Sequence, residues 1–221
     1  MIKFEKTDVF NFEGAFRGMR NPLNSWDKSD SYMSYEYSSW DRREDRYEFV
    51  EIGSNDLNLA RRLIKAGPDH RKFLRQIFVS VDITAPLYWW KEFDTYKVAT
   101  VANSCSTMHK IHAKPIELSD FSIDDFYIED DGIDLRDCFI NVVADCESLR
   151  LKYLETKDKK YWRGLIQLLP VSYNQKRTVT LNYETLRNIY GSRRNHKLTE
   201  WSIGFTDWID SLPYAEELIK M

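Results

Sequence analysis

The sequence predicts an α+β fold in a single domain over residues 1–221. Alternating apolar and polar residues, which are typical of strands, are concentrated in the first half of the chain, and helical periodicity dominates the second half. The length suits one compact domain. No internal repeat, low-complexity tract or linker divides the chain.

Strands are predicted at residues 1–12, 31–52 and 76–84. In the second range, "YMSYEYSS" alternates aromatic with small residues and "RYEFVEIG" is rich in residues that favour strands. In the third, "RQIFVSVDIT" alternates, as expected of a half-buried strand. Its predicted buried face carries Ile77, Val79, Val81 and Ile83.

Helices are predicted where apolar residues recur at intervals of three and four. "SNDLNLARRLIKAGPDH" has capping residues from Ser54 to Asp56 and a stop at Gly67-Pro68. Pro86 is expected to open a second helix at its first turn. Four sets of residues are assigned to helix faces in the core: Leu59, Leu63 and Ile64; Trp89, Trp90 and Phe93; and the long stripes Leu135, Phe139, Val142, Cys146, Leu149, Tyr153 and Leu198, Trp201, Phe205, Trp208, Leu212.

Composition argues against several classes of function. A net charge of −3 provides no basic field, so no nucleic-acid polymer is expected as a partner. No apolar run approaches the roughly 20 residues of a membrane span, and "MIKFEKTDVF" lacks the apolar core of a secretory signal. Three cysteines at unrelated spacings favour a reducing cytoplasm over a disulfide framework. Seven Trp and thirteen Tyr offer flat surfaces for burial, subunit interfaces or stacking.

Two local patterns are weak candidates for metal sites. Cys105, His109 and His112 are ligand types, but a structural zinc site needs four ligands and no second pair lies nearby. The acidic stretch "DDFYIEDDGID", residues 124–134, does not have the spacing of a calcium loop and is expected to be a solvated connection. We therefore expect no metal. No nucleophile elbow, phosphate loop or dinucleotide fingerprint is present.

The N-terminal stretch "FRGMRNPLNSWDKSDS" is unusually rich in cations and amides around one aromatic residue, Trp26. Such a set suits a phosphate and a stacked base. The alternative is a surface turn with Trp26 tucked into the core. The polar members are Arg17, Arg20, Asn21, Asn24, Ser25, Asp27 and Lys28.

The order of segments adds a family resemblance. "LARRLIKAGPDHRKFLRQIFVSVDITAPLYWWKEF" and "LLPVSYNQKRTVTLNYETLRNIYGSRR" together resemble the flavin-dependent thymidylate synthases. In that family a helix leads to a Glu-His pair, a strand and a Pro-led helix ending in Arg-His-Arg-x-x-Ser; a Leu-Pro, a Thr-x-Asn and a helix ending in arginine follow. The counterparts are Asp69-His70, residues 76–84, Pro86, Leu169-Pro170, Thr180 with Asn182, and Arg193. The resemblance covers about residues 54–108 and 160–205, and implies an antiparallel or mixed sheet with flanking long helices.

The resemblance also implies a binding site. Counting from Pro86, the arginine motif falls on Thr95-Tyr96-Lys97 and Thr100, and the next polar cluster, which serves flavin and nucleotide, falls on residues 103–107. No catalytic side chain is implied, because the flavin performs the chemistry. The implied flavin residues are His70, Asn103, Asn182 and Asn188; the implied nucleotide residues are Glu92, Lys97, Thr100, Ser104 and Arg193, with Arg20 from the N-terminal stretch.

The replaced motif, which would form one wall of the nucleotide site, carries less positive charge than the Arg-His-Arg-x-x-Ser motif of the family. Lys97 supplies a point charge where a bidentate arginine would grip phosphate, and Glu184 stands where the family commonly has an arginine near the flavin. Weaker binding of nucleotide monophosphates is therefore expected. Arg193 has an alternative role as a cation that the helix dipole favours at a C-terminus.

The implied function is FAD-dependent methylation of dUMP at C5 to give dTMP, a thymidylate synthase type of methyltransferase in nucleotide biosynthesis. NADPH and methylenetetrahydrofolate are the implied co-substrates, and the flavoprotein is expected to be a homotetramer with flavin between subunits. Two alternatives stay open: a flavin- or nucleotide-binding relative without synthase activity, and a structural or partner-binding protein on the same fold.

Overall fold

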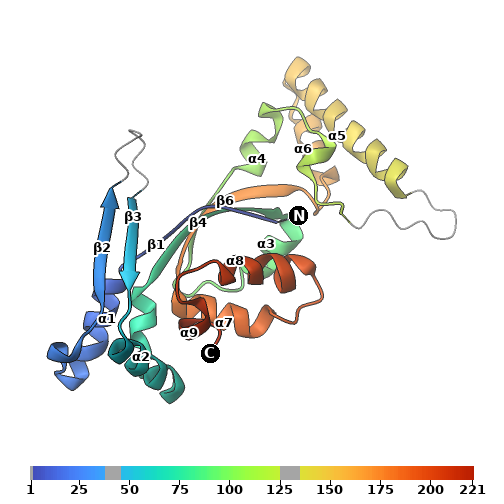
Figure 1. Ribbon diagram of the computed structural model, residues 1–221. Helices are drawn as coiled ribbons and strands as arrows, with labels where there is room; N and C mark the ends of the chain where they lie inside the picture. Colours follow the sequence, from blue (N-terminus) through green and yellow to red (C-terminus); the bar gives the residue numbers. More distant parts are fainter. Residues whose placement is uncertain (1, 38–45, 125–134) are drawn as a thin grey trace. The chain divides into compact units, whose positions relative to one another are not determined.

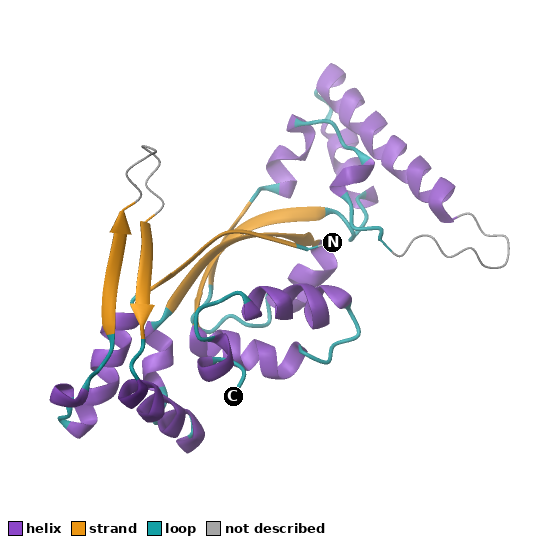
Figure 2. Ribbon diagram, in the orientation of Figure 1, coloured by secondary structure: helices purple, strands orange, loops and turns teal. Residues whose placement is uncertain are grey.

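A four-stranded sheet and a separate hairpin establish the α+β class in the computed structural model, which describes residues 2–37, 46–124 and 135–221 (Figures 1 and 2). The sheet has the order β1-β4-β6-β5, formed by Lys3–Phe10, Phe78–Pro86, Asn174–Asn182 and Val101–Ser104. All but Asp124 of the acidic stretch at residues 124–134 lies outside the described residues.

The chain divides into two compact units. Unit 1 comprises Met1–Glu5, Asp82–Thr95 and Ala102–Thr178, and unit 2 comprises Lys6–Val81, Tyr96–Val101 and Val179–Met221. Strands β1, β4 and β6 each contribute residues to both units.

In unit 2, the strands predicted within residues 31–52 are confirmed. Strands β2 (Tyr32–Tyr37) and β3 (Arg46–Glu51) pair antiparallel, with Tyr32 opposite Glu51. The first predicted strand, however, ends early: β1 stops at Phe10, Asn11 adopts a left-handed conformation, and α1 begins at Phe12 and ends at Arg20. Burial of Phe12, Phe16 and Met19 explains this helix, which the sequence analysis assigned to strand and turn. The short 3-10 helices η1 (Asn21–Leu23) and η2 (Trp26–Lys28) follow.

The helix predicted from Ser54 is confirmed as α2 (Ser54–Ala66), but its capping differs from the expectation. Neither Ser54 nor Asp56 caps it. Asp30, 25 residues upstream, accepts hydrogen bonds from the backbone N–H groups of Asn55 and Asp56, at 2.9 and 3.0 Å. Gly67, at φ 108°, ends the helix as predicted, because a side chain there would be strained.

Strand β4 buries the predicted face, with Ile77, Val79, Val81 and Ile83 at most 1% exposed. Gln76, the first residue of the predicted strand, instead ends the 3-10 helix η3 (Lys72–Gln76). Pro86 is extended and ends β4, so α3 (Leu87–Phe93) begins one residue later than predicted.

In unit 1, α5 (Leu135–Thr156) packs against α6 (Lys159–Leu168), beside α4 (Thr107–Lys110), η4 (Ile111–Ala113) and η5 (Leu118–Asp120). The core there combines Phe139 and Cys146 of α5 with Leu165, Phe121 and Tyr173. The predicted long stripe is thus confirmed, except that Leu135 is 43% exposed.

The C-terminal part of unit 2 contains α7 (Tyr183–Arg193), a π-helical turn η6 (Glu200–Phe205), α8 (Thr206–Asp210) and α9 (Ala215–Leu218). Trp201, Phe205 and Trp208 are buried as predicted. Trp89, Trp90 and Trp201, which were assigned to helix faces in the core, are at most 1% exposed, so this assignment is confirmed. Within the described ranges, no helix is long and apolar enough to cross a membrane.

Candidate functional site

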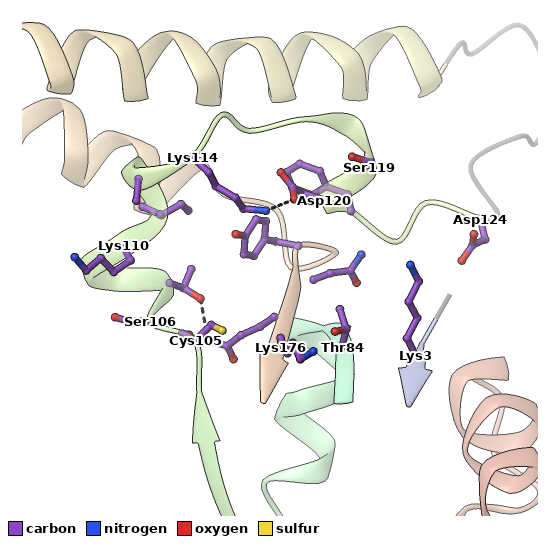
Figure 3. Close-up of a pocket in the computed structure, with 17 residues that line it drawn as sticks. Lys3, Thr84, Cys105, Ser106, Lys110, Lys114, Ser119, Asp120, Asp124 and Lys176 are labelled. Atoms are coloured by element: carbon purple, nitrogen blue, oxygen red, sulfur yellow. Dashed lines mark hydrogen bonds and ion pairs between the residues drawn. The ribbon is translucent and has the colours of Figure 1, made fainter. Parts of the chain in front are cut away.

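A cavity of about 670 Å³ lies in unit 1 (Figure 3). Three residues of the predicted polar cluster, Cys105, Ser106 and Thr107, line it, whereas Asn103 and Ser104 lie just upstream on the exposed strand β5. The other lining residues are Lys3, Thr84, Lys110, Ile111, Ala113, Lys114, Ser119, Asp120, Phe121, Asp124, Tyr173, Asn174, Gln175 and Lys176.

Hydrogen bonds fix the polar cluster against the first residues of β6. The backbone N–H of Cys105 donates to the carbonyl of Lys176 at 2.9 Å. Gln175 Nε2 donates to the Cys105 carbonyl at 2.8 Å and to Thr107 Oγ1 at 2.9 Å. The Ser106 hydroxyl caps α4 by accepting from the N–H of His109. This wall is therefore built before any ligand binds, which lowers the entropic cost of binding.

Lysines give the cavity a positive lining. Lys114 pairs with Asp120, and Lys176 pairs with Glu5 and Asp82 (Figure 3 shows the first pair). These hydrogen bonds raise the pKa of Lys114 and of Lys176 above the ordinary value, so both are cations at neutral pH. Lys3 and Lys110 have no ion-pair partner among the described residues. With four lysines and two aspartates in its lining, the cavity favours an anion.

An aromatic and apolar floor complements this charge. Tyr173 is buried, and its burial raises the pKa of the phenol, which therefore stays neutral and able to donate a hydrogen bond. Its ring lies edge-on to Phe121, with centroids 5.6 Å apart. A cavity of this volume with a few polar groups on an apolar floor is typical of a small-molecule site. The arrangement suits a ligand that carries both an anionic group and a planar ring.

In unit 2, Arg193 has aromatic neighbours. Its Nε donates to the Tyr96 hydroxyl at 2.8 Å, and its guanidinium carbon lies 5.6 Å from the Tyr96 ring centroid and 5.1 Å from that of Trp201. Two residues assigned to the nucleotide wall by order alone, Tyr96 of the replaced motif and Arg193, are thus in contact. Arg193 also ends α7, so its role as a C-terminal cation is realised as well.

Lys97 and Thr100, the other residues of the implied nucleotide wall in this segment, differ in exposure. Lys97 is exposed, and Thr100 Oγ1 is buried without a hydrogen-bond partner in the part of the chain that the structure describes. Val98 and Val101 are 85% and 68% exposed, which is unusual for apolar residues so close together.

Glu184 does not leave an uncompensated negative charge. Arg71 binds its carboxylate with two parallel hydrogen bonds, Nε to Oε2 at 2.9 Å and Nη2 to Oε1 at 3.1 Å. Both side chains are largely buried. The expectation that Glu184 repels anions from the flavin side is therefore weakened, because the bidentate pair is neutral overall.

The implied flavin residues of unit 2 differ in availability. His70 and Asn188 are exposed. Asn182 is buried and caps α7: its Oδ1 accepts from the N–H of Thr185 at 2.9 Å, and its Nδ2 donates to the Arg75 carbonyl at 3.2 Å. Asn182 therefore has a structural role whatever it contacts besides. Of the other implied residues, Glu92, Asn103 and Ser104 belong to unit 1.

Arg20 is buried, at 3% exposed, and pairs with Asp56. The N-terminal stretch is thus partly helix and partly ordered turn. Trp26 is 52% exposed, with Nε1 donating to Asn21 Oδ1, so the alternative that placed Trp26 in the core is wrong.

The three candidate metal ligands differ in their surroundings. Cys105 and His109 are exposed, while the His112 ring packs edge-on to Tyr153 with centroids 5.0 Å apart. Among the residues that the structure describes, no three His, Cys, Asp or Glu side chains are grouped so as to hold a metal.

The sequence analysis missed the cavity's lysines. Three distant segments of the chain supply these lysines: Lys3 comes from the first, Lys110 and Lys114 from the second, and Lys176 from the third. No local sequence pattern therefore reveals them. The spacing of four between Lys110 and Lys114 was the only local signal, and such pairs are common on solvated helix faces.

Comparison with solved structures identifies the fold. Two crystal structures of the flavin-dependent thymidylate synthase ThyX from Helicobacter pylori, both with FAD and dUMP, are similar to this chain. One has a TM-score of 0.67 and 15% identity, covering 99% of this chain and 98% of its own. The other has a TM-score of 0.65 and 16% identity, covering 99% and 96%. No family model matches the sequence. No curated protein matches it either. The predicted fold, that of the flavin-dependent thymidylate synthases, is therefore confirmed.

Proposed function

We propose that this protein binds FAD and a uracil nucleotide and catalyses thymidylate synthase-like C5 methylation with altered nucleotide contacts. The fold provides the frame, and similar structures were solved with FAD and dUMP. The observation that carries the proposal is the cavity of unit 1. The polar cluster expected to serve flavin and nucleotide supplies Cys105, Ser106 and Thr107 to a preformed, positively charged cavity of ligand size.

In this proposal the cavity holds the nucleotide. Lys114 and Lys176, fixed by their carboxylate partners, and the unpaired Lys110 attract the phosphate. Tyr173 and Phe121 offer ring surfaces to the base, and Gln175 orients the wall. Lysines thus replace the missing arginines of the family motif, as point charges rather than bidentate groups, and weaker binding follows.

Some of the residues that the family resemblance assigns to flavin binding are available to bind FAD. His70 and Asn188 are exposed and free to bind, Glu184 is neutralised by Arg71, and the buried Thr100 hydroxyl lacks the hydrogen bond that a ligand or a second subunit would complete. When bound, FAD would supply the redox chemistry. The chain's own residues would bind and orient the nucleotide and exclude water. NADPH and methylenetetrahydrofolate remain the implied co-substrates.

A homotetramer is part of this proposal. Val98 and Val101 are highly exposed in the same segment as Lys97 and Thr100, and a subunit packed there would bury them. Such packing would also place the exposed flavin residues at an interface. Three free cysteines agree with a cytoplasmic location.

Two measurements test the function. Protein purified without added cofactor should be yellow and carry FAD by mass spectrometry, and it should release tritium from dUMP labelled at C5 when supplied with NADPH and methylenetetrahydrofolate. Flavin without tritium release would favour the alternative of a binding relative without synthase activity, which the replacement of the arginine motif supports. Absence of both would leave a structural or partner-binding protein on this fold.

A further inference from the structure

A second cavity, of about 500 Å³, lies in unit 2, between the stretch after α1 and one face of α2. Asn55, Asn58 and Arg62 recur at spacings of three and four along α2, so they share a face. Arg20, Ser25 and Lys28 face them from the N-terminal stretch. Leu59 forms a buried floor and Leu23 an exposed rim.

The lining is cationic without a carboxylate. It contains Arg20, Lys28 and Arg62, and no Asp or Glu, in a chain whose net charge is −3. The side chains of Lys28 and Arg62 have no polar partner among the described residues. Arg20 is already paired with Asp56, but the proximity of Lys28 and Arg62 costs free energy unless something compensates for their repulsion, and a bound anion is the simplest compensation.

Arg20 is the strongest sign of a built site. Its side chain is nine-tenths buried or more; Nε is paired with Asp56 and Nη1 donates to the carbonyl and the hydroxyl of Ser25. Arg20 is a lining residue of the cavity, and its Nη2 makes no hydrogen bond to any residue in the described ranges. A guanidinium has five donors in a fixed fork, so the remaining ones are held ready for an acceptor.

The walls of this cavity are rigid. Besides Arg20, Asp56 accepts from Ser29, from the N–H of Asp30 and from both the N–H and the hydroxyl of Ser31. Asp30 in turn caps α2. These reciprocal bonds tie the N-terminal stretch to the start of α2, so binding requires little further ordering.

From this geometry we propose that the unit 2 cavity is a binding site for a phosphorylated small molecule of about nucleoside monophosphate size. Arg20, Lys28 and Arg62 receive the phosphate, Asn55 and Asn58 offer amide groups to a sugar or base, and Leu23 and Leu59 contact its apolar parts. The cavity shares no residue with the unit 1 cavity, so this site does not depend on the function proposed above.

The test is titration of the whole protein with uridine 5′-monophosphate, with uridine and inorganic phosphate in parallel, combined with hydrogen exchange to locate the bound ligand. Binding should slow exchange in residues 20–31 and 54–62, and uridine should fail to bind there. Arg62→Ala and Lys28→Ala should each lower affinity at this site by about tenfold or more, because each removes a charged contact. Lys65→Ala, which removes an exposed cation of α2 outside the cavity, is the matched control and should change nothing.

Two results would overturn the site: no protection of residues 20–31 and 54–62 by either phosphate-bearing probe, or equal affinity in the wild type, Arg62→Ala and Lys28→Ala. Protection confined to residues 105–120 would support the nucleotide cavity of unit 1 while removing this one. The two proposals are thus judged separately.

Discussion

Arg193 donates a hydrogen bond from Nε to the hydroxyl of Tyr96 over 2.8 Å, with Trp201 also beside its guanidinium. Tyr96 stands where the family resemblance places the histidine of the arginine motif. Tyr96 therefore orients a guanidinium that α7 supplies.

Arg193 does not line the unit 1 cavity, so its variants test whether the wall implied by the family resemblance holds the nucleotide instead. If that wall holds dUMP, Arg193→Ala should weaken dUMP binding by about ten- to hundredfold, since a bond to a charged group is lost; if the unit 1 cavity holds it, the affinity should not change. Tyr96→Phe keeps the ring and removes only the hydroxyl, so its effect should be smaller. Isothermal titration measures both, and Arg194→Ala, the exposed neighbour, is the control. Equal affinity in wild type and Arg193→Ala would leave Arg193 as a helix-terminal cation only.

Lys97 is the remaining cation of the replaced motif, and it is exposed. If the wall implied by the family resemblance holds dUMP, Lys97→Ala should abolish residual dUMP binding, whereas Lys97→Arg should keep or strengthen it, because a guanidinium can bind phosphate with two hydrogen bonds. If the unit 1 cavity holds dUMP, neither variant should change the affinity, because Lys97 does not line that cavity. The measurement is titration of dUMP into the flavin-loaded protein. Unchanged affinity in Lys97→Ala would show that the lysines of the unit 1 cavity hold the phosphate without it.

Alanine variants of Asn182 and His70 should separate a role in stability from a role in flavin binding. Asn182→Ala removes the cap of α7 and should lower the free energy of unfolding by about 0.5–2 kcal/mol. His70→Ala should leave that free energy unchanged and lower flavin retention, because its side chain is exposed. Urea unfolding and the flavin content of the purified variants measure the two effects. A stable Asn182→Ala, or a His70→Ala that unfolds while retaining flavin, would contradict these roles.

Asp56 makes stability depend on pH. Burial alone would raise the pKa of Asp56, but hydrogen bonds from Ser31, Ser29 and Arg20 outweigh it and hold that pKa below its ordinary value. Its contribution to stability is therefore full above the pKa of an unfolded aspartate, near ~3.9, and is lost as pH falls through the lower folded-state pKa. At pH 7, Asp56→Asn should cost about 3–5 kcal/mol, because Arg20 is left buried and unpaired.

Denaturant unfolding of wild type and Asp56→Asn at several pH values measures this effect. The difference between the two should narrow below about pH 4, where Asp56 of the unfolded chain begins to bind a proton, and should vanish as pH falls through the lower folded-state pKa. Asp27→Asn, on an exposed residue of η2, is the control. A difference that stays constant down to acid would mean that hydrogen bonds, rather than charge, account for the effect of Asp56.

Much of the fold was predictable because burial follows local period. The alternation of Ile77 to Ile83 and the stripe from Trp201 to Leu212 reflect apolar faces that must be covered, whatever covers them. The helix α1 was missed because its apolar residues, Phe12 and Phe16, directly continue a strand pattern. The start of α1 depends on the left-handed conformation of Asn11, which no local sequence pattern predicts.

The candidate site was predictable only where order along the chain carried it. Family order assigned Tyr96 to the replaced motif and Arg193 to the implied nucleotide site, and the two are in contact. The lysines of the unit 1 cavity and the cap that Asp30 gives to α2 arise from contacts between distant segments, which no local spacing encodes. Glu184 was expected to weaken anion binding for the same reason: its ion-pair partner Arg71 lies 113 residues away, and local sequence does not reveal it.

Cysteine reactivity provides a direct measurement of nucleotide binding in the unit 1 cavity. Cys105 lines the cavity and is exposed, Cys138 is exposed on α5 outside it, and Cys146 is buried. Burial raises the pKa of Cys146 to about 11, so that thiol should react slowly and serve as a baseline. Alkylation with iodoacetamide, followed residue by residue by mass spectrometry, reports on all three.

The central claim, that the unit 1 cavity holds the nucleotide, predicts that saturating dUMP slows alkylation of Cys105 at least severalfold and leaves Cys138 unchanged. Uridine, which lacks the phosphate, should protect Cys105 much less. Equal rates at Cys105 with and without dUMP, in protein shown to contain flavin, would contradict the claim and place the nucleotide elsewhere.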